Sequence, residues 1–161
     1  MASQLESLCF TDAPPIAADV ARGVTRLFCR QDLFAICEMP LPNGRRADLM
    51  AIDSKGWLTI VEIKVAKADL TGDGKWTDYL EYCDRFFWAV PPQLAHLLEE
   101  QRFLPGHAGL IVADRYDAAV VRHAVHRPLA PARRKAELLR FARRAARRLA
   151  AQIDPSLGEA S

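Results

Sequence analysis

Two carboxylates and an amine are spaced so that one β-hairpin would bring them together. Residues 57 to 65 have the composition of a strand, and side chains two apart on a strand share a face. Glu62 and Lys64 are therefore expected to point the same way. Asp48 lies on the stretch before this strand, where a second strand would run back toward it.

The turn between the two strands sets which residues face each other. Residues 53 to 56 read Asp-Ser-Lys-Gly, and a three-residue loop with Gly56 in the left-handed conformation would place Asp48 opposite Glu62, with Cβ atoms about 4.5 to 5.5 Å apart. Directly opposed like charges destabilise a sheet, so the pair indicates a divalent cation bound between them. The pattern predicts a metal-dependent hydrolase site.

A third acid follows the same reasoning. Glu38 lies ten residues before Asp48, and a turn near Asn43 and Gly44 would fold its strand back so that the two acids face each other within about one residue of register. Three acids on three adjacent strands could thus form a cluster.

Composition favours one folded domain over residues 1–161, because half of the residues are apolar and 161 residues suffice for an ordinary core. We find no bilayer-length apolar run and no signal-peptide pattern at the start of the sequence, so a cytoplasmic protein with no membrane association is expected. The four cysteines form no CxxC pair and receive no chemical role.

The elements that would position these residues are read from periodicity and turn signals. The expected order is a helix capped by Thr11 or Asp12, strands at 33–39, 47–53 and 57–65, a helix starting at Asp69, Thr71 or Asp73 and reaching about 84, a strand at 86–90, a helix at 93–102, and strands at 109–113 and 118–126. A strongly helix-favouring segment follows at 132–153. This order predicts an α/β fold with a mixed sheet in which the strands at 86–90 and 109–113 pair in parallel.

The last helix carries most of the charge asymmetry. Residues 133 to 148 hold eight basic side chains against the single acid Glu137. Arg140, Arg144 and Arg148 recur every four residues and are expected to form a ladder opposite a packing stripe of Leu138, Ala142, Ala145 and Leu149. Such a ladder favours a polyanion such as DNA.

The sequence resembles the PD-(D/E)XK nuclease superfamily, whose αβββαβ core bears an Asp on one strand and Glu/Asp-X-Lys on the next. Asp48 and Glu62-Ile63-Lys64 match these positions, although Ala47 replaces the Pro before the Asp. The stretch from Gly44 to Pro91, with RRAD, KWTDYLEYCD and FFWAVP in this order, is similar to the MmcB family of bacterial DNA repair proteins within that superfamily. The expected fold is a restriction-endonuclease-like core over about 14–126 with a C-terminal basic helix.

The resemblance implies a DNA endonuclease that uses Mg²⁺, with Mn²⁺ as a substitute. Asp48, Glu62 and the Ile63 carbonyl would hold the metal, with Glu38 as a further ligand or outer partner. Lys64 would orient or deprotonate the attacking water and offset charge on the phosphate. The resemblance also makes Lys75 and Tyr79, one turn apart on a helix, candidates for phosphate contact.

Several alternatives stay open at this point. Arg45 and Arg46 meet either phosphate or the neighbouring acids, and Asp19 competes as a fourth acid but is better read as a solvated helix residue. The competing function is a catalytically silent DNA-binding or protein-docking module that keeps the fold. RNA could replace DNA with the same metal chemistry. Repair or translesion-synthesis proteins are expected partners, and a cut in both strands would require a homodimer.

Overall fold

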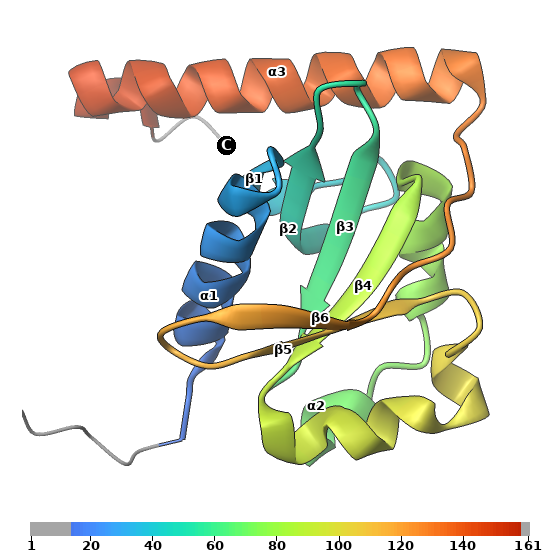
Figure 1. The fold of residues 1–161 in the computed structure, drawn as a ribbon. Helices are drawn as coiled ribbons and strands as arrows, with labels where there is room; N and C mark the ends of the chain where they lie inside the picture. Colours follow the sequence, from blue (N-terminus) through green and yellow to red (C-terminus); the bar gives the residue numbers. More distant parts are fainter. Residues whose placement is uncertain (1–13, 159–161) are drawn as a thin grey trace, which may run out of the picture.

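Six β-strands form one sheet in which the strands lie side by side in sequence order (Figure 1). The structure is a computed structural model and describes residues 14–158. The strands are β1 (Phe34–Pro40), β2 (Arg46–Ile52), β3 (Leu58–Ile63), β4 (Arg85–Val90), β5 (Gly109–Ala113) and β6 (Ala118–Arg122). The α-helices are α1 (Ala17–Arg30), α2 (Lys67–Thr71) and α3 (Pro131–Ile153), and the 3-10 helices are η1 (Trp76–Tyr82), η2 (Pro92–Glu99), η3 (Gln101–Phe103) and η4 (Pro155–Gly158).

Strands β1, β2 and β3 form the expected antiparallel meander, and β5 pairs antiparallel with β6. The strands β3, β4 and β5 pair in parallel. The prediction of an α/β fold with a mixed sheet and a C-terminal helix is confirmed. Whether the core is restriction-endonuclease-like stays a prediction.

The hairpin between β2 and β3 has the predicted register. Gly56 has a φ of +80°, which glycine adopts without a steric penalty, and the backbone N–H of Asp53 donates to the Trp57 carbonyl at 3.1 Å. Leu49 pairs with Val61, so the next positions along the two strands, Asp48 and Glu62, lie opposite each other. Turn chemistry alone was sufficient to fix this register.

Helix α1 covers one face of the sheet. Its buried residues Val20, Val24, Leu27 and Phe28 pack on a cluster that includes Leu49, Val61, Phe87 and Ile111. Gly23 allows α1 to approach the turn between β5 and β6, because a Cβ at this position would lie 2.8 Å from the Asp114 carbonyl oxygen. The caps proposed for this helix, Thr11 and Asp12, lie outside the described residues, and Asp19 reaches back to accept the Ile16 N–H at 3.0 Å. This contact agrees with the reading of Asp19 as a helix residue.

The other face is covered by η1, η2 and α3. An aromatic cluster of Trp76, Phe86, Trp88 and Phe103 fills its centre, with ring centroids 5.1 to 5.4 Å apart. Edge-to-face and tilted pairs at such distances add to the stability gained from burying the rings. These aromatic residues are packing residues.

Two predicted helices are wrong in type. The helix expected from about residue 69 to 84 is instead the short α2 and the 3-10 helix η1, separated by a loop that contains Gly72 and Gly74. Each glycine inside a helix costs about 1 kcal/mol relative to alanine, so two in three residues favour the break. The helix expected at 93–102 is the pair of 3-10 helices η2 and η3, interrupted by Glu100 in an extended conformation.

Helix α3 crosses the hairpin that joins β2 and β3 (Figure 1), and a Cβ placed on Gly56 would lie 3.5 Å from a methyl group of Leu138. It begins with Pro131, which suits the first helical position because that residue needs no N–H partner. Its buried residues are Glu137 and Phe141, whereas Leu149 is 62% exposed and Ala142 is exposed. The predicted packing stripe is therefore wrong at Ala142 and Leu149, whereas Leu138 and Ala145 are half-buried.

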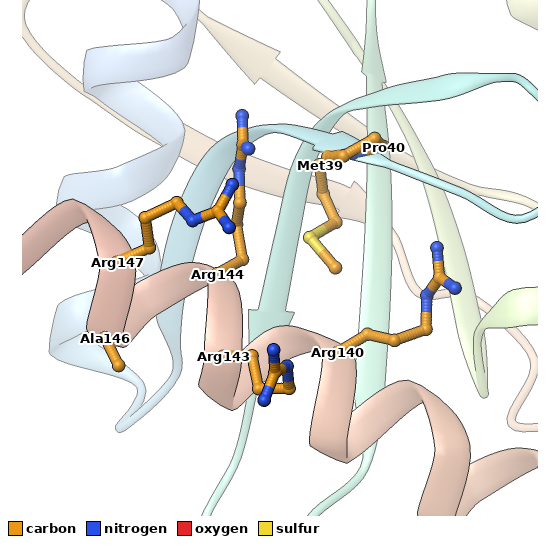
Figure 2. Close-up of a pocket in the computed structure, with 7 residues that line it drawn as sticks. All are labelled: Met39, Pro40, Arg140, Arg143, Arg144, Ala146 and Arg147. Carbon is orange, nitrogen blue, oxygen red and sulfur yellow. The ribbon is translucent and has the colours of Figure 1, made fainter. Parts of the chain in front are cut away.

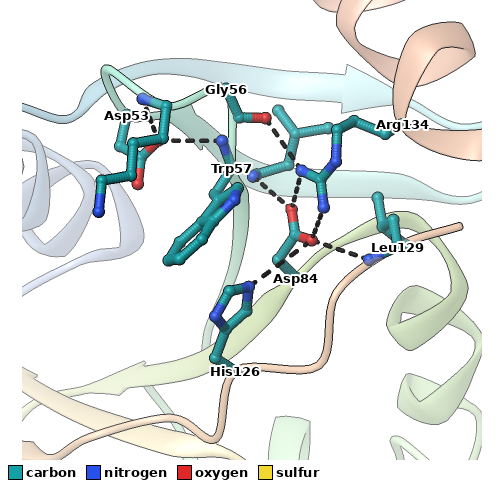
Figure 3. Close-up of polar contacts among 9 residues, drawn as sticks. Asp53, Gly56, Trp57, Asp84, His126, Leu129 and Arg134 are labelled. Atoms are coloured by element: carbon teal, nitrogen blue, oxygen red, sulfur yellow. Dashed lines mark hydrogen bonds and ion pairs between the residues drawn. The ribbon is translucent and has the colours of Figure 1, made fainter. Parts of the chain in front are cut away.

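The buried carboxylate of Asp84 ties α3 to the sheet (Figure 3). It accepts the backbone N–H groups of Leu58 at 2.8 Å and Leu129 at 2.9 Å, and both terminal nitrogens of Arg134. Arg134 also donates to the Gly56 carbonyl at 3.1 Å. One carboxylate thus joins β3, the segment before α3, and α3 itself.

Within residues 14 to 158 we find no helix that is both long and apolar enough to cross a membrane.

Candidate functional site

The carboxylates of Asp48 and Glu62 each accept a backbone N–H from the neighbouring strand. The Asp48 N–H donates to Oε1 of Glu62 at 3.2 Å, and the Ile63 N–H donates to Oδ2 of Asp48 at 2.7 Å. The last backbone pair of β2 and β3 before this point is Leu49 with Val61. Where the backbone pairing of β2 and β3 ends, the two side-chain carboxylates therefore accept the backbone N–H groups in place of carbonyl oxygens. The predicted juxtaposition of the two acids is found.

Burial and mutual repulsion shape the electrostatics of this pair. Glu62 is only 4% exposed, and burial together with the charge of Asp48 raises the pKa of Glu62 to about 8. Burial also raises the pKa of Asp48, against the opposing effect of the Ile63 N–H and of Lys64. A bound cation would stabilise both carboxylates in the charged form. The pair therefore has the chemistry of a cation site.

Lys64 enters the same pocket and is held there by an acid that sequence reasoning missed. Its Nζ lies 3.0 Å from Oδ2 of Asp73, and the two side chains are 16% and 13% exposed. Asp73 lies in the loop between α2 and η1 and also contributes to the raised pKa of Glu62. Asp73 was predicted only as a possible start of a helix, and nothing in its position between two glycines indicated the lysine that it meets.

Glu38 lies opposite Asp48 in register but does not join the pair. The backbone of Glu38 is left-handed, with a φ of 51°, and the alternation of β1 breaks there, since Ile36 and Met39 face the same core cluster. The Glu38 side chain is 63% exposed and its Oε1 lies 3.6 Å from Nη2 of Arg46. The predicted cluster of three acids is wrong, because the left-handed turn of the backbone directs this carboxylate to solvent.

Over residues 14 to 158 there is no group of three or more His, Cys, Asp or Glu side chains placed to hold a metal ion. A cation at this site would therefore have two protein carboxylates, with a backbone carbonyl such as that of Ile63 and water completing the set. The role of Glu38 as an outer partner stays a prediction.

The carboxylate pair opens into a cavity of about 400 Å³ that is lined mostly by polar groups. Tyr79 is buried at its wall and donates its hydroxyl to the Arg46 carbonyl at 3.2 Å, and burial raises the pKa of Tyr79 to about 12. The lining residues are Arg45, Arg46, Asp48, Glu62, Ile63, Lys64, Asp69, Gly72, Asp73 and Tyr79. Lys75 is exposed, does not line this cavity and precedes η1, so Lys75 and Tyr79 are not neighbours one turn apart on a helix as predicted.

The two arginines at the cavity wall pair with acids. Nε of Arg45 lies 2.9 Å from Oδ2 of Asp78, and its guanidinium lies 5.6 Å from the centroid of the Tyr79 ring. Arg46 pairs with Glu38 and remains largely exposed. Both arginines are thus observed to pair with neighbouring acids, and their contact with phosphate stays a prediction.

The basic ladder of α3 faces the sheet. Arg140, Arg144 and Arg148 are partly buried, and Nη2 of Arg148 donates to the Glu38 carbonyl at 3.3 Å. The prediction placed these arginines opposite a packing stripe, and this orientation is wrong because the helix buries Glu137 and Phe141 instead. The ladder consequently lies beside β1, near the residue that faces Asp48.

The fold and this site define an α/β protein with a mixed sheet, a buried carboxylate pair at the end of a hairpin, and a lysine and several arginines around it. The chain belongs to the MmcB-like DNA repair protein family, whose family model matches residues 8–156. This membership confirms the resemblance to the MmcB family and indicates a role in DNA repair.

A solved structure with the same fold is that of a protein of unknown function from Silicibacter pomeroyi. It is 42% identical to this chain with a TM-score of 0.79, and the match covers 90% of this chain and 95% of that one. A search of curated proteins found no match.

Proposed function

We propose that the chain is a Mg²⁺-dependent DNA endonuclease of the PD-(D/E)XK type that acts in DNA repair. The observation that carries this proposal is the buried pair of Asp48 and Glu62, opposed across β2 and β3 with Lys64 in the same cavity. Opposed buried carboxylates destabilise the fold unless a positive charge, such as a bound cation, offsets theirs. The ammonium of Lys64 beside them would contact a phosphate of DNA.

The residues fit Mg²⁺. It prefers hard oxygen ligands, is commonly bound through one or two carboxylates, and keeps several waters. Asp48 and Glu62, with the Ile63 carbonyl, provide a set of this kind, and Mn²⁺ would substitute. When bound, such an ion lowers the pKa of an attacking water and stabilises negative charge on the phosphate.

The other residues around the cavity would orient the substrate and neutralise its charge. Asp73 fixes the ammonium of Lys64 beside Glu62, which favours a role for Lys64 in offsetting charge on the phosphate and orienting water over one in accepting a proton. The Tyr79 hydroxyl keeps its proton at neutral pH and donates it to the Arg46 carbonyl, which favours a role in positioning the cavity wall. Arg45 and Arg46 would exchange their acidic partners for phosphate oxygens when DNA is present.

A second function is supported by a different observation. The described residues contain no three-acid cluster, and Lys64 is already paired with Asp73. These features favour a DNA-binding or protein-docking module of a repair or mutagenesis complex that keeps the nuclease fold without cleaving. Repair or translesion-synthesis partners and a homodimer belong to either alternative.

Cleavage of branched, flapped and single-stranded DNAs in Mg²⁺ or Mn²⁺ tests the enzyme. Glu62→Gln and Lys64→Ala should each abolish cleavage because they remove site charge without emptying the core, while Glu81→Gln, an exposed acid on η1, should cleave as the wild type does. Mg²⁺ titration by calorimetry should show weaker binding in Asp48→Ala.

If both site variants cleave normally, or if Asp48→Ala binds Mg²⁺ as tightly as the wild type, the assigned site is wrong. DNA binding without cleavage by the wild-type chain would favour the second function.

A further inference from the structure

A second cavity of about 450 Å³ lies between α3 and the end of β1, and four arginines line it (Figure 2). Met39 and Pro40 contribute from β1, and Met39 lies between Arg140 and Arg144 in the view of Figure 2. The other lining residues are Arg143, Ala146 and Arg147. Cavities of this size are typical of ligand sites, and most of the polar groups here carry the same charge.

Polar atoms at this cavity lack partners. Nε of Arg140 and Nε of Arg144 are buried and make no hydrogen bond within the described residues. A buried donor left unpaired costs about 1 to 3 kcal/mol, so native structures usually satisfy it with protein, water or ligand. Both atoms are shielded from solvent, so an anion in the cavity would be held by the terminal nitrogens of the lining arginines.

The nearby acid does not fill this need. Glu137 is fully buried, and its oxygens lie 3.7 Å from Arg133 and 3.6 Å from Arg140, too far for hydrogen bonds. Neither Glu137 oxygen has a hydrogen-bond partner in residues 14–158. Four arginines are among the residues that line the cavity, and no acid is among them, so the lining favours an anion.

We propose that this arginine cavity binds a backbone phosphate of DNA and is a second contact for the strand that reaches the carboxylate pair. Met39, which lines the cavity, follows Glu38 in β1, and Glu38 lies opposite Asp48. Arg148 of α3 donates a hydrogen bond to the Glu38 carbonyl and so joins α3 to β1. The two sites therefore flank the same end of β1. Guanidinium groups bind phosphate and carboxylate alike in a bidentate manner, and the DNA repair family is what favours a phosphate here. The inference rests on the proposed function only in taking DNA as the ligand.

DNA affinity measured against salt concentration tests the cavity separately from catalysis. A short fluorescein-labelled duplex is titrated with protein in EDTA, where no metal-dependent cleavage occurs. Each phosphate contact contributes a log–log slope of about −0.9 on duplex DNA. Loss of this one phosphate contact in Arg143→Gln/Arg147→Gln should therefore flatten the slope by about 0.9, and Arg143→Gln alone should flatten it by a part of that amount.

Lys135→Gln is the matched control, because Lys135 is exposed on the same helix and does not line the cavity. It should leave the slope unchanged. Arg143 is exposed, so its substitution should also leave the thermal midpoint unchanged. If Arg143→Gln and Lys135→Gln flatten the slope equally, the salt dependence arises from the overall charge of α3 and not from the cavity, and the proposal is overturned. No flattening in either would make the face a solvated or protein-docking surface, which also overturns it.

The two proposals fail in different measurements. If the wild type cleaves no DNA, and the salt slope of DNA binding is flattened in the cavity variants but not in Lys135→Gln, the nuclease proposal is refuted and phosphate binding in the arginine cavity is supported. Cleavage lost in Glu62→Gln together with an unchanged slope in the cavity variants does the reverse.

Discussion

Replacing Arg134 by Gln should destabilise the fold far more than an ordinary surface arginine would. The Asp84 carboxylate that Arg134 neutralises is fully buried, and Arg134 itself is 21% exposed. Removing one partner of a buried ion pair costs about 3 to 5 kcal/mol because the other charge is left without compensation. The partial exposure of Arg134 places the expected loss near the lower end, about 3 kcal/mol, which corresponds to a fall of about 6 to 12 °C in Tm for a chain of this size.

The same substitution should change how stability depends on pH. Burial raises the pKa of Asp84, but hydrogen bonds from Arg134 and from the N–H groups of Leu58 and Leu129 outweigh it and hold the pKa below the ordinary value for aspartate. Because the pKa of Asp84 is lower in the folded than in the unfolded state, its ionised form stabilises the fold at pH values above the unfolded-state pKa. This stabilisation is lost as the pH falls through the folded-state pKa. Arg134→Gln should therefore lose less of its remaining stability on acidification than the wild type does.

Thermal unfolding followed by circular dichroism at neutral and acidic pH measures both effects. The matched control is Arg30→Gln, since the ion pair between Arg30 and Asp117 has side chains that are 53% and 66% exposed. An exposed pair contributes about 0 to 1 kcal/mol. The double variant Asp84→Asn/Arg134→Gln should be more stable than the sum of the two single losses predicts. A Tm of Arg134→Gln no lower than that of Arg30→Gln would refute the assignment of Asp84 as the tie between α3 and the sheet.

Two further predictions concern the acids of the candidate site. Because burial and Asp48 raise the pKa of Glu62 to about 8, the wild type should lose stability as pH rises from the ordinary range of glutamate through this value. Glu62→Gln should remove that loss in EDTA and be the more stable protein at alkaline pH, and parallel pH profiles of Tm would contradict this. A left-handed residue with a Cβ costs about 1 to 2 kcal/mol, so Glu38→Gly should be about 1 kcal/mol more stable than Glu38→Ala. Urea midpoints compare these two variants, which both lose the exposed contact with Arg46, and an alanine variant as stable as the glycine variant would speak against strain at this position.

Local signals in the sequence were sufficient for the strands and for the acid pair. Gly56 determined the turn, the turn determined the register, and the register placed Asp48 opposite Glu62. Each of these steps depends on residues close in sequence, where backbone sterics and side-chain alternation are decisive. The segments at 109–113 and 132–153 were likewise recognisable from composition alone.

What the sequence did not reveal depends on contacts through space. The side chain of Asp73 meets Lys64 because of the path of a loop, which two glycines permit but do not dictate. Glu38 has a left-handed backbone inside an otherwise ordinary strand pattern, and nothing about a glutamate predicts this. The orientation of α3 was also out of reach, because alanines lie all around it. The buried carboxylate of Asp84, fifty residues from Arg134 in sequence, helps to fix which side faces inward.

The order of the strands has a consequence for how the chain can fold during synthesis. Since every strand pairs with its predecessor in sequence, the sheet can grow one strand at a time as the polypeptide emerges from the ribosome, with short turns from β1 to β3 and longer connections that contain helices before β4 and β5. Asp84 is different, because it accepts the Leu58 N–H within the sheet while its cation, Arg134, comes fifty residues later in the chain. A nascent chain that ends before α3 would leave Asp84 without its arginine. Arrival of the last helix thus completes the ion pair that ties α3 to the sheet, and the arginines that line the cavity arrive with it.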